Sequence, residues 1–193
     1  MTSSPNNVLW LDFETTGLMT DPATVPLEGA AIITDGELNE LTVLDSIVIH
    51  ASPFELSAMD NYVYEMHSQT GLLESVRAST VTRTEFDLAL RDFAAPHFPS
   101  RGEILDDGKP YRGIVIGGNS VKFDFDVIEK FFPETRATID YRVIDISGVG
   151  ELVKRWNRPA WEAMPAKLSD HTAMMDIREG VKELRYYRQV LGA

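Results

Sequence analysis

The chain has 193 residues, of which 44% are hydrophobic and 25% charged, an ordinary composition for one soluble globular domain. Its 30 acidic and 18 basic residues give a formal net charge of −12, so it lacks the basic surplus with which proteins bind long nucleic acids. An acidic protein can still act on phosphodiesters where divalent cations supply the positive charge, and it should then favour substrates with few phosphates.

The sequence also limits where the protein acts. Its apolar runs are no longer than a strand, so we expect no membrane span. The polar start MTSSPNNV has none of the features of a secretory signal. The absence of cysteine excludes disulfides and thiolate metal sites. We expect a cytoplasmic protein with a single domain over residues 1–193.

The first predicted strand lies in VLWLDFETTGL, residues 8–18. On a pleated strand, Asp12 and Glu14 share a face with Trp10, and apolar side chains take the other face. Two residue rises separate the two acids by about 6.5–7 Å between Cα atoms. Carboxylates this close repel each other unless a positive charge lies between them. The pair is therefore a candidate cation site, although an isolated Asp-x-Glu is more often a solvated strand end.

A hairpin and two helices are predicted next. GAAIIT and LTVLDSIVIH have the character of strands, and the Asp35-Gly36 pair between them is a hairpin signal. Pro26 and Gly29, in PLEGA, are expected to loosen the start of the second strand. One helix is predicted over residues 54–71 with Ser52 as its cap, and another over 82–95.

The second half alternates helices and strands. Residues 97–113 are polar and are predicted to form a loop, a surface insertion on the domain. Strands are predicted in GIVIGGN and YRVIDIS, and helices in SVKFDFDVIEKFF, GVGELVKRW and residues 172–191. This order predicts an α/β domain with a mixed sheet.

Helical periodicity separates two acids in SVKFDFDVIEKFF. Asp124 falls within about 60° of Val127 and other apolar residues, whereas Asp126 lies with Lys122 on the solvated side. A carboxylate that faces the core costs several kcal/mol unless it finds a partner or a metal. Asp124 is therefore the third candidate ligand, with a paired structural acid as the alternative.

His171 and Asp176 are five residues apart in HTAMMD. On a continuous helix they would point about 140° apart, so they converge only if His171 precedes the helix, with Ser169 or Asp170 as the cap. Taken alone, His171 is more typical of a surface or capping histidine.

The order of DFET, NSVKFD and HTAMMD resembles the DEDDh family of 3′–5′ exonucleases, which has the ribonuclease H-like fold. Over nearly the whole chain, NNVLWLDFETTGL, MDNYVYEMHSQTGL, GNSVKFD, YRVIDIS and DHTAMMDIREGVKELRYY resemble segments of the oligoribonuclease family within it. The resemblance implies a five-stranded mixed sheet flanked by helices, and hydrolysis of RNA to 5′-mononucleotides.

The resemblance also implies the roles of the candidate residues. Two Mg²⁺ or Mn²⁺ ions would be bound by the four acids Asp12, Glu14, Asp124 and Asp176. His171 would be the general base, a role that an unperturbed pKa near 6.5 allows. The cations would supply the positive charge that the Asp12–Glu14 pair needs.

The resemblance further implies short single-stranded RNA substrates, down to dinucleotides, and a homodimer. Leu18 and Tyr141 would wedge the bases apart, and His67, Ser120 and Arg142 would surround the 5′ phosphate, with Tyr141 and Arg142 coming from the partner subunit. Three departures leave substrate length and base preference open. They are the PLEGA strand, Tyr62 where the family has tryptophan, and the long 97–113 segment.

Two other functions are compatible with parts of the pattern. A DEDDh DNA exonuclease of the proofreading type shares the five catalytic residues but has no use for Tyr141 and Arg142 across a dimer. A non-catalytic nucleotide-binding scaffold would normally lose a metal ligand, and none is lost here.

Overall fold

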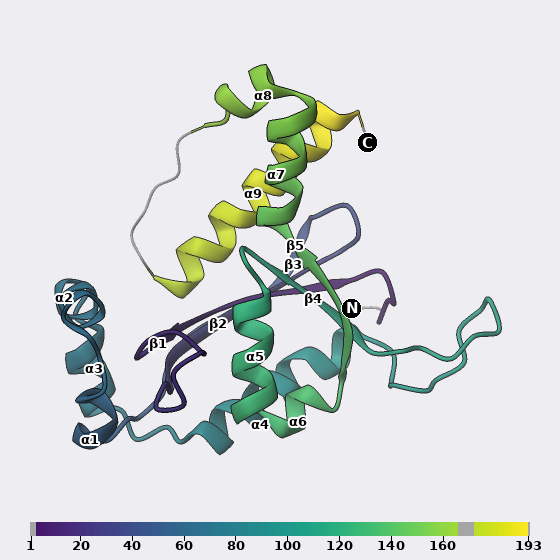
Figure 1. The fold of residues 1–193 in the computed structure, drawn as a ribbon. Helices are drawn as coiled ribbons and strands as arrows, with labels where there is room; N and C mark the ends of the chain where they lie inside the picture. Colours follow the sequence, from purple (N-terminus) through teal and green to yellow (C-terminus); the bar gives the residue numbers. More distant parts are fainter. Residues whose placement is uncertain (1–2, 166–171, 193) are drawn as a thin grey trace.

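A five-stranded mixed sheet with the order β3-β2-β1-β4-β5 forms the centre of the fold (Figure 1). The computed structural model describes residues 3–165 and 172–192. The strands are β1 (Val8–Thr15), β2 (Pro26–Thr34), β3 (Glu40–Val48), β4 (Ile114–Gly118) and β5 (Ile139–Asp145). β2 is antiparallel to β1 and β3, whereas β4 is parallel to β1 and β5. The predicted mixed α/β sheet is confirmed.

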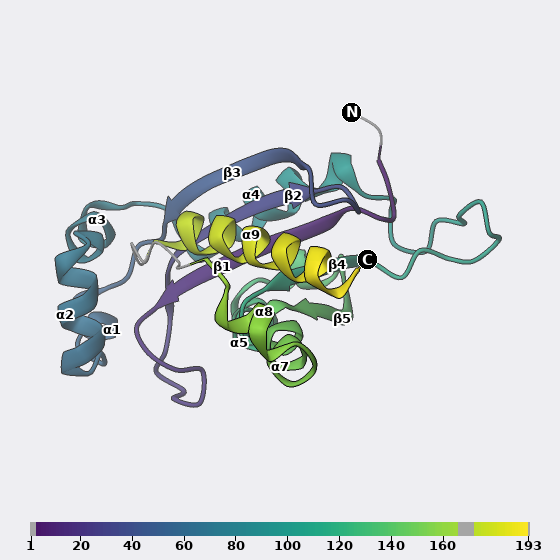
Figure 2. The same ribbon diagram turned by 90° about the horizontal axis from the view of Figure 1, so that it is seen from above.

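Helices cover both faces of the sheet (Figures 1 and 2). One face carries α4 (Arg83–Ala94), a 3₁₀ turn (Ala95–His97), α5 (Lys122–Phe131) and α6 (Pro133–Arg136), and the other carries α7 (Ile146–Trp156), α8 (Arg158–Glu162) and α9 (Ala173–Leu191). Leu9, Leu11 and Phe13 pack in the core with α4 and α5, whereas Trp10 packs in the core with α7 and α9. Asp12 and Glu14, which share the Trp10 face, are therefore directed toward α9.

Residues 53–78 form three short helices instead of the continuous helix predicted for 54–71. They are α1 (Pro53–Leu56), α2 (Asn61–Gln69) and α3 (Leu72–Ala78), and they lie together beyond the end of β1 (Figure 1). Ser52 caps α1 as predicted, but Asp60 then caps α2 by accepting a hydrogen bond from the Val63 amide at 2.8 Å. Gly71 separates α2 from α3 with φ +77°. The prediction was wrong because a capping side chain inside a helical pattern begins a new helix.

The expected loosening of β2 is confirmed only in part: β2 is continuous from Pro26, but its register shifts next to Pro26 against β1 and after Gly29 against β3. Pro26 is the first residue of β2 and pairs with Thr15 at a shift in register, a place where a missing amide costs little. Gly29 pairs with Phe13, and a Cβ atom on Gly29 would meet the ring of Phe86 at 2.5 Å and that of Phe13 at 2.7 Å. The glycine makes room for two aromatic rings, so it belongs to a tightly packed strand.

Residues 101–112 form an irregular segment, which we call the arm, that extends away from the sheet (Figures 1 and 2). Its two sides are joined by a bridge between Ile104 and Pro110 and by a hydrogen bond from the Tyr111 amide to the Glu103 carbonyl at 2.7 Å. The loop predicted here is confirmed, while its status as an insertion stays a prediction. Over residues 3–165 and 172–192, no helix combines the length and apolar character needed to cross a membrane.

Candidate metal centre and substrate rim

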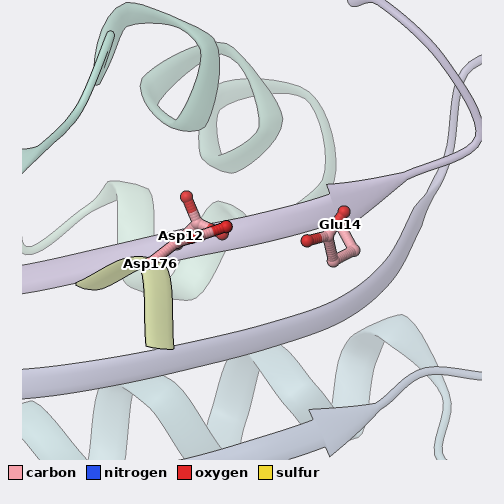
Figure 3. A group of neighbouring side chains, drawn as sticks. All are labelled: Asp12, Glu14 and Asp176. Carbon is pink, nitrogen blue, oxygen red and sulfur yellow. The ribbon is translucent and has the colours of Figure 1, made fainter. Parts of the chain in front are cut away.

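Three carboxylates meet on the Trp10 face of β1 (Figure 3). Asp12, Glu14 and Asp176 each offer an oxygen, and these oxygens lie within 4.8 Å of one another. β1 supplies the first two, and the first turn of α9 supplies Asp176. β1 pairs with β4 at Leu9 and Trp10. Asp12 and Glu14 therefore lie beyond these paired residues, where β1 and β4 separate. Three converging carboxylates are a typical ligand set for a hard divalent cation.

Asp124 approaches the same strand from the first turn of α5. Its side chain is 2% exposed, and Oδ1 accepts a hydrogen bond from the Phe13 amide, between the two acids of β1, at 3.1 Å. Asp126 is partly exposed and forms an ion pair with Lys122. The predicted separation of the two acids by helical periodicity is therefore confirmed.

Without a cation, the site disfavours its own negative charge. Burial, followed by the charges of Asp176 and Glu28, raises the pKa of Asp12 to about 7. Burial, followed by the charge of Asp12 and then those of Asp176 and Glu28, raises the pKa of Glu14 to about 8. Burial and the charge of Asp12 also hold the pKa of Asp124 well above its usual range. Such shifts are expected where a missing positive charge would otherwise stabilise the carboxylates.

Glu28 is a fifth acid at this site, and the sequence analysis missed it. It is 8% exposed and lies on β2 directly opposite Glu14. The alternation of PLEGAAII puts Glu28 on the same face as Ala30 and Ile32, so the signal was present once the strand is allowed to begin at Pro26. Because the sequence analysis did not expect a regular strand at PLEGA, it did not assign Glu28 to this face of the sheet.

The predicted base cannot be located. His171 lies outside the described residues, as do Ser169 and Asp170, which were predicted as caps. The helix predicted over residues 172–191 is confirmed as α9, and its N-cap is Thr172 in place of the predicted residues.

The loop after β1 carries Leu18 and is held in place from several sides. Leu18 is 70% exposed, while its carbonyl accepts hydrogen bonds from the Thr24 hydroxyl at 2.7 Å and the Asp21 amide at 2.9 Å. Lys130 of α5 donates to the Pro22 and Thr24 carbonyls at 2.9 and 3.1 Å. The loop therefore presents an exposed apolar side chain on a fixed backbone.

His67 supports the base of this loop. It is 1% exposed, and its Nε2 donates to the Thr15 carbonyl at 2.9 Å. Burial lowers the pKa of His67, against the opposing effects of the Thr15 contact and the Glu28 charge. His67 is therefore a buried residue of α2 and not a surface histidine.

Ser120 lies at the turn between β4 and α5, in the left-handed region with φ +52°. Its amide donates to Asp145 Oδ1 at 3.1 Å and to Ser147 Oγ at 3.0 Å, and the two serine hydroxyls are 3.3 Å apart. Asp145 also caps α7 through the Ser147 and Gly148 amides. Ser147, in the first turn of α7, is a second polar residue next to Ser120, and the sequence analysis gave it no role.

Tyr141 and Arg142 lie on β5, at the edge of the sheet, and Tyr141 is 64% exposed. Ile144 and Trp10 are level across β4, because both pair with Gly117. A register shift in β5 puts Tyr141 about level with Val115, so two strand spacings and about four residue rises separate it from Asp12, roughly 16 Å between Cα atoms. The structure therefore does not bring Tyr141 to the carboxylates of its own chain.

Known proteins match this chain in sequence and in fold. Residues 9–100 match the RNase_T exonuclease family. The chain is 37% identical to an oligoribonuclease of Nocardia farcinica over 182 residues, which cover 94% of this chain and 79% of that protein. It is 36% identical to the oligoribonuclease of Escherichia coli over 189 residues, which cover 98% of this chain and 97% of that protein. E. coli exonuclease I in complex with a dA16 oligonucleotide has a TM-score of 0.64 at 17% identity, covering 95% of this chain and 41% of that chain.

The chain thus spans about two fifths of the solved exonuclease I chain, and this likeness shows the fold alone: it is ribonuclease H-like. The family match and the similarity to the curated relatives define the class of protein as an exonuclease. The similarity to curated relatives over nearly their whole length then gives the particular family. The chain belongs to the oligoribonuclease family, and it is a 3′–5′ exoribonuclease.

Proposed function

We propose that this protein hydrolyses short single-stranded RNA, down to 5′-phosphorylated dinucleotides, and releases 5′-mononucleotides. The observation that carries the proposal is the convergence of Asp12, Glu14 and Asp176 within 4.8 Å, with buried Asp124 bonded to the backbone between the first two.

The donor set fits two Mg²⁺ or Mn²⁺ ions. All the donors are carboxylate oxygens, which these hard cations prefer. Burial and the neighbouring acids raise the pKa values of Asp12 and Glu14, and a bound cation would offset both effects. Asp12, Glu14, Asp124 and Asp176 would hold the ions. When bound, the ions supply the charge that activates a water molecule and stabilises the leaving 3′ oxygen.

The protein's own residues would orient the metal ligands and deprotonate the attacking water. The Phe13 amide holds the Asp124 carboxylate next to the strand that carries Asp12 and Glu14, and it would limit the rearrangement that this ligand needs. His171 would accept the proton of the attacking water as general base, which requires a largely neutral imidazole near pH 7.

The predicted substrate-binding residues, which we call the substrate rim, would select short RNA. They are Leu18, His67, Ser120, Tyr141 and Arg142. Exposed Leu18 would wedge between bases from its fixed loop, which buried His67 supports. His67, Ser120 and Arg142 would surround the 5′ phosphate. Tyr141 and Arg142 would complete the rim from the partner subunit of a homodimer, which their distance from the carboxylates of their own subunit supports. The net charge of −12 also disfavours substrates with many phosphates.

A length series tests the proposal. With Mn²⁺, the protein should convert a 5′-phosphorylated diribonucleotide to monophosphates and slow sharply on a tetranucleotide and on long single-stranded RNA. Equal rates on all three would contradict the short-substrate proposal. Faster hydrolysis of long single-stranded DNA would instead favour a DNA exonuclease. Asp12→Ala is the control, and it should abolish turnover on every substrate because a metal ligand is lost.

A further inference from the structure

Arg112, the last residue of the arm, packs against Tyr141 and Arg142. These are the two residues proposed to contact the substrate that the partner subunit binds. Its guanidinium carbon is 5.1 Å from the centre of the Tyr141 ring. The guanidinium carbon of Arg142 is 5.0 Å from the same ring centre. One exposed aromatic ring thus contacts two cations, one from its own strand and one from the arm.

A buried carboxylate keeps these two cations together. The side chain of Asp140 is 5% exposed, and its Oδ2 lies 3.5 Å from Arg112 Nε and 4.0 Å from Arg142 Nη1. Its Oδ1 accepts a hydrogen bond from the Arg142 amide at 3.0 Å. Two cations beside one ring repel each other, so an anion between them is what makes the arrangement stable.

The position of Arg112 is imposed by the backbone. Gly113 has φ +130°, and a Cβ atom there would lie 2.6 Å from the Thr138 carbonyl oxygen and 2.9 Å from the Asp140 amide nitrogen. The Ile114 amide donates to the same Thr138 carbonyl at 2.9 Å. The end of the arm is therefore held against the start of β5, which keeps the backbone of Arg112 next to Asp140.

We propose that Arg112 is a positioning residue for Tyr141 and Arg142, and that it sets how tightly the protein binds short 5′-phosphorylated RNA. This inference rests on the proposed function, because it takes Tyr141 and Arg142 to contact the substrate.

The physical reason is competition for Asp140. Arg112 is the closer of the two cations to this buried carboxylate, so Arg142 keeps a looser contact and stays available for a phosphate. Without Arg112, the carboxylate would still need a cation, and Arg142 would be drawn onto it. Tyr141 would lose one of its two cationic neighbours at the same time, and its exposed ring would gain conformational freedom.

The test compares Arg112→Ala, Arg112→Lys and a matched control, Arg101→Ala. Arg101 belongs to the same arm, is exposed, and donates to the Ala137 carbonyl at 3.0 Å. For Arg112→Ala, we expect KM for a 5′-phosphorylated diribonucleotide to rise about three- to tenfold, with kcat within about twofold and the unfolding temperature close to wild type. Arg112→Lys should recover part of this loss because it keeps a cation at the ring and the carboxylate. Arg101→Ala should behave as wild type.

Three results would overturn the inference: a wild-type KM for Arg112→Ala, an equal rise in KM for Arg101→Ala, or a fall in kcat and unfolding temperature that Arg112→Lys does not rescue. Tyr141→Ala separates this failure from failure of the proposed function. If Tyr141→Ala raises KM and Arg112→Ala does not, the inference alone fails. If Tyr141→Ala leaves KM unchanged, the proposed role of the rim fails as well.

Discussion

The carboxylates and the substrate rim are built in opposite ways. The four acids come from β1, α5 and α9, elements packed in the core, and Asp124 is almost fully buried. Leu18 and Tyr141 are 70% and 64% exposed, on a loop and on an edge strand. The proposed metal ligands thus lie on packed elements, while the residues proposed to select substrate length lie where substitutions do not disturb the core.

The largest expected effect comes from changing one of the four carboxylates that the packed elements hold. Asp124→Asn should lower kcat by about 10²–10³-fold, because a buried charge at the metal site is lost while the shape is kept. Asp126→Asn, two residues along the same helix, loses only a surface ion pair with Lys122 and should stay within about twofold of wild type. Steady-state kinetics on the diribonucleotide measure both, and the reverse ranking would contradict the assignment of Asp124.

The second prediction concerns pH. Since the pKa values of Asp12 and Glu14 are raised to about 7 and 8, the folded metal-free protein binds protons that the unfolded chain has already released. Its stability should therefore fall as pH rises from about 4 to 8. Cations need the ionised ligands, so Mn²⁺ affinity should rise over the same range, by about tenfold per pH unit for each proton released.

Thermal unfolding with EDTA or Mn²⁺ at pH 6 and pH 8 measures this second effect. The stabilisation by Mn²⁺ should be larger at pH 8. A larger gain at pH 6 would mean that these carboxyls are not the ligands.

The third prediction tests the rim. Leu18→Ala should raise KM for the diribonucleotide by about tenfold, because the exposed side chain loses its apolar contact with a base. The unfolding temperature should be unchanged, since the side chain is not part of the core. A drop in stability with an unchanged KM would assign Leu18 to folding instead.

The smallest effect should come from the anchor of the Leu18 loop. Lys130→Ala removes two hydrogen bonds to the Pro22 and Thr24 carbonyls, and we expect a rise in KM below about threefold and a loss of stability below about 1 kcal/mol. Lys122→Ala, on the same helix, is the control and should leave KM at wild type. Identical KM values for the two variants would show that the loop is held without Lys130.

The same contrast explains what could be predicted from the sequence. The faces of β1 and the burial of Asp124 follow from periodicity, because core packing enforces a regular alternation of apolar and polar residues. The breaks in residues 53–78 depend on the Asp60 cap and on Gly71 in a left-handed conformation, and a helical pattern alone conceals both.

Contacts between segments far apart in the chain could not be predicted from the sequence. Nothing in PLEGA indicates that Gly29 packs against Phe86, so its inclusion in β2 could not be predicted, and Glu28 was missed with it. The contact of Arg112 with Tyr141 joins an irregular segment to an edge strand, and no periodicity describes such a pair.

The close packing of Gly29 has an evolutionary consequence. The rings of Phe13 and Phe86 occupy the volume that a side chain at Gly29 would need. A larger residue at Gly29 would be tolerated only alongside a smaller residue at Phe13 or Phe86, so we expect these three positions to vary together among related sequences.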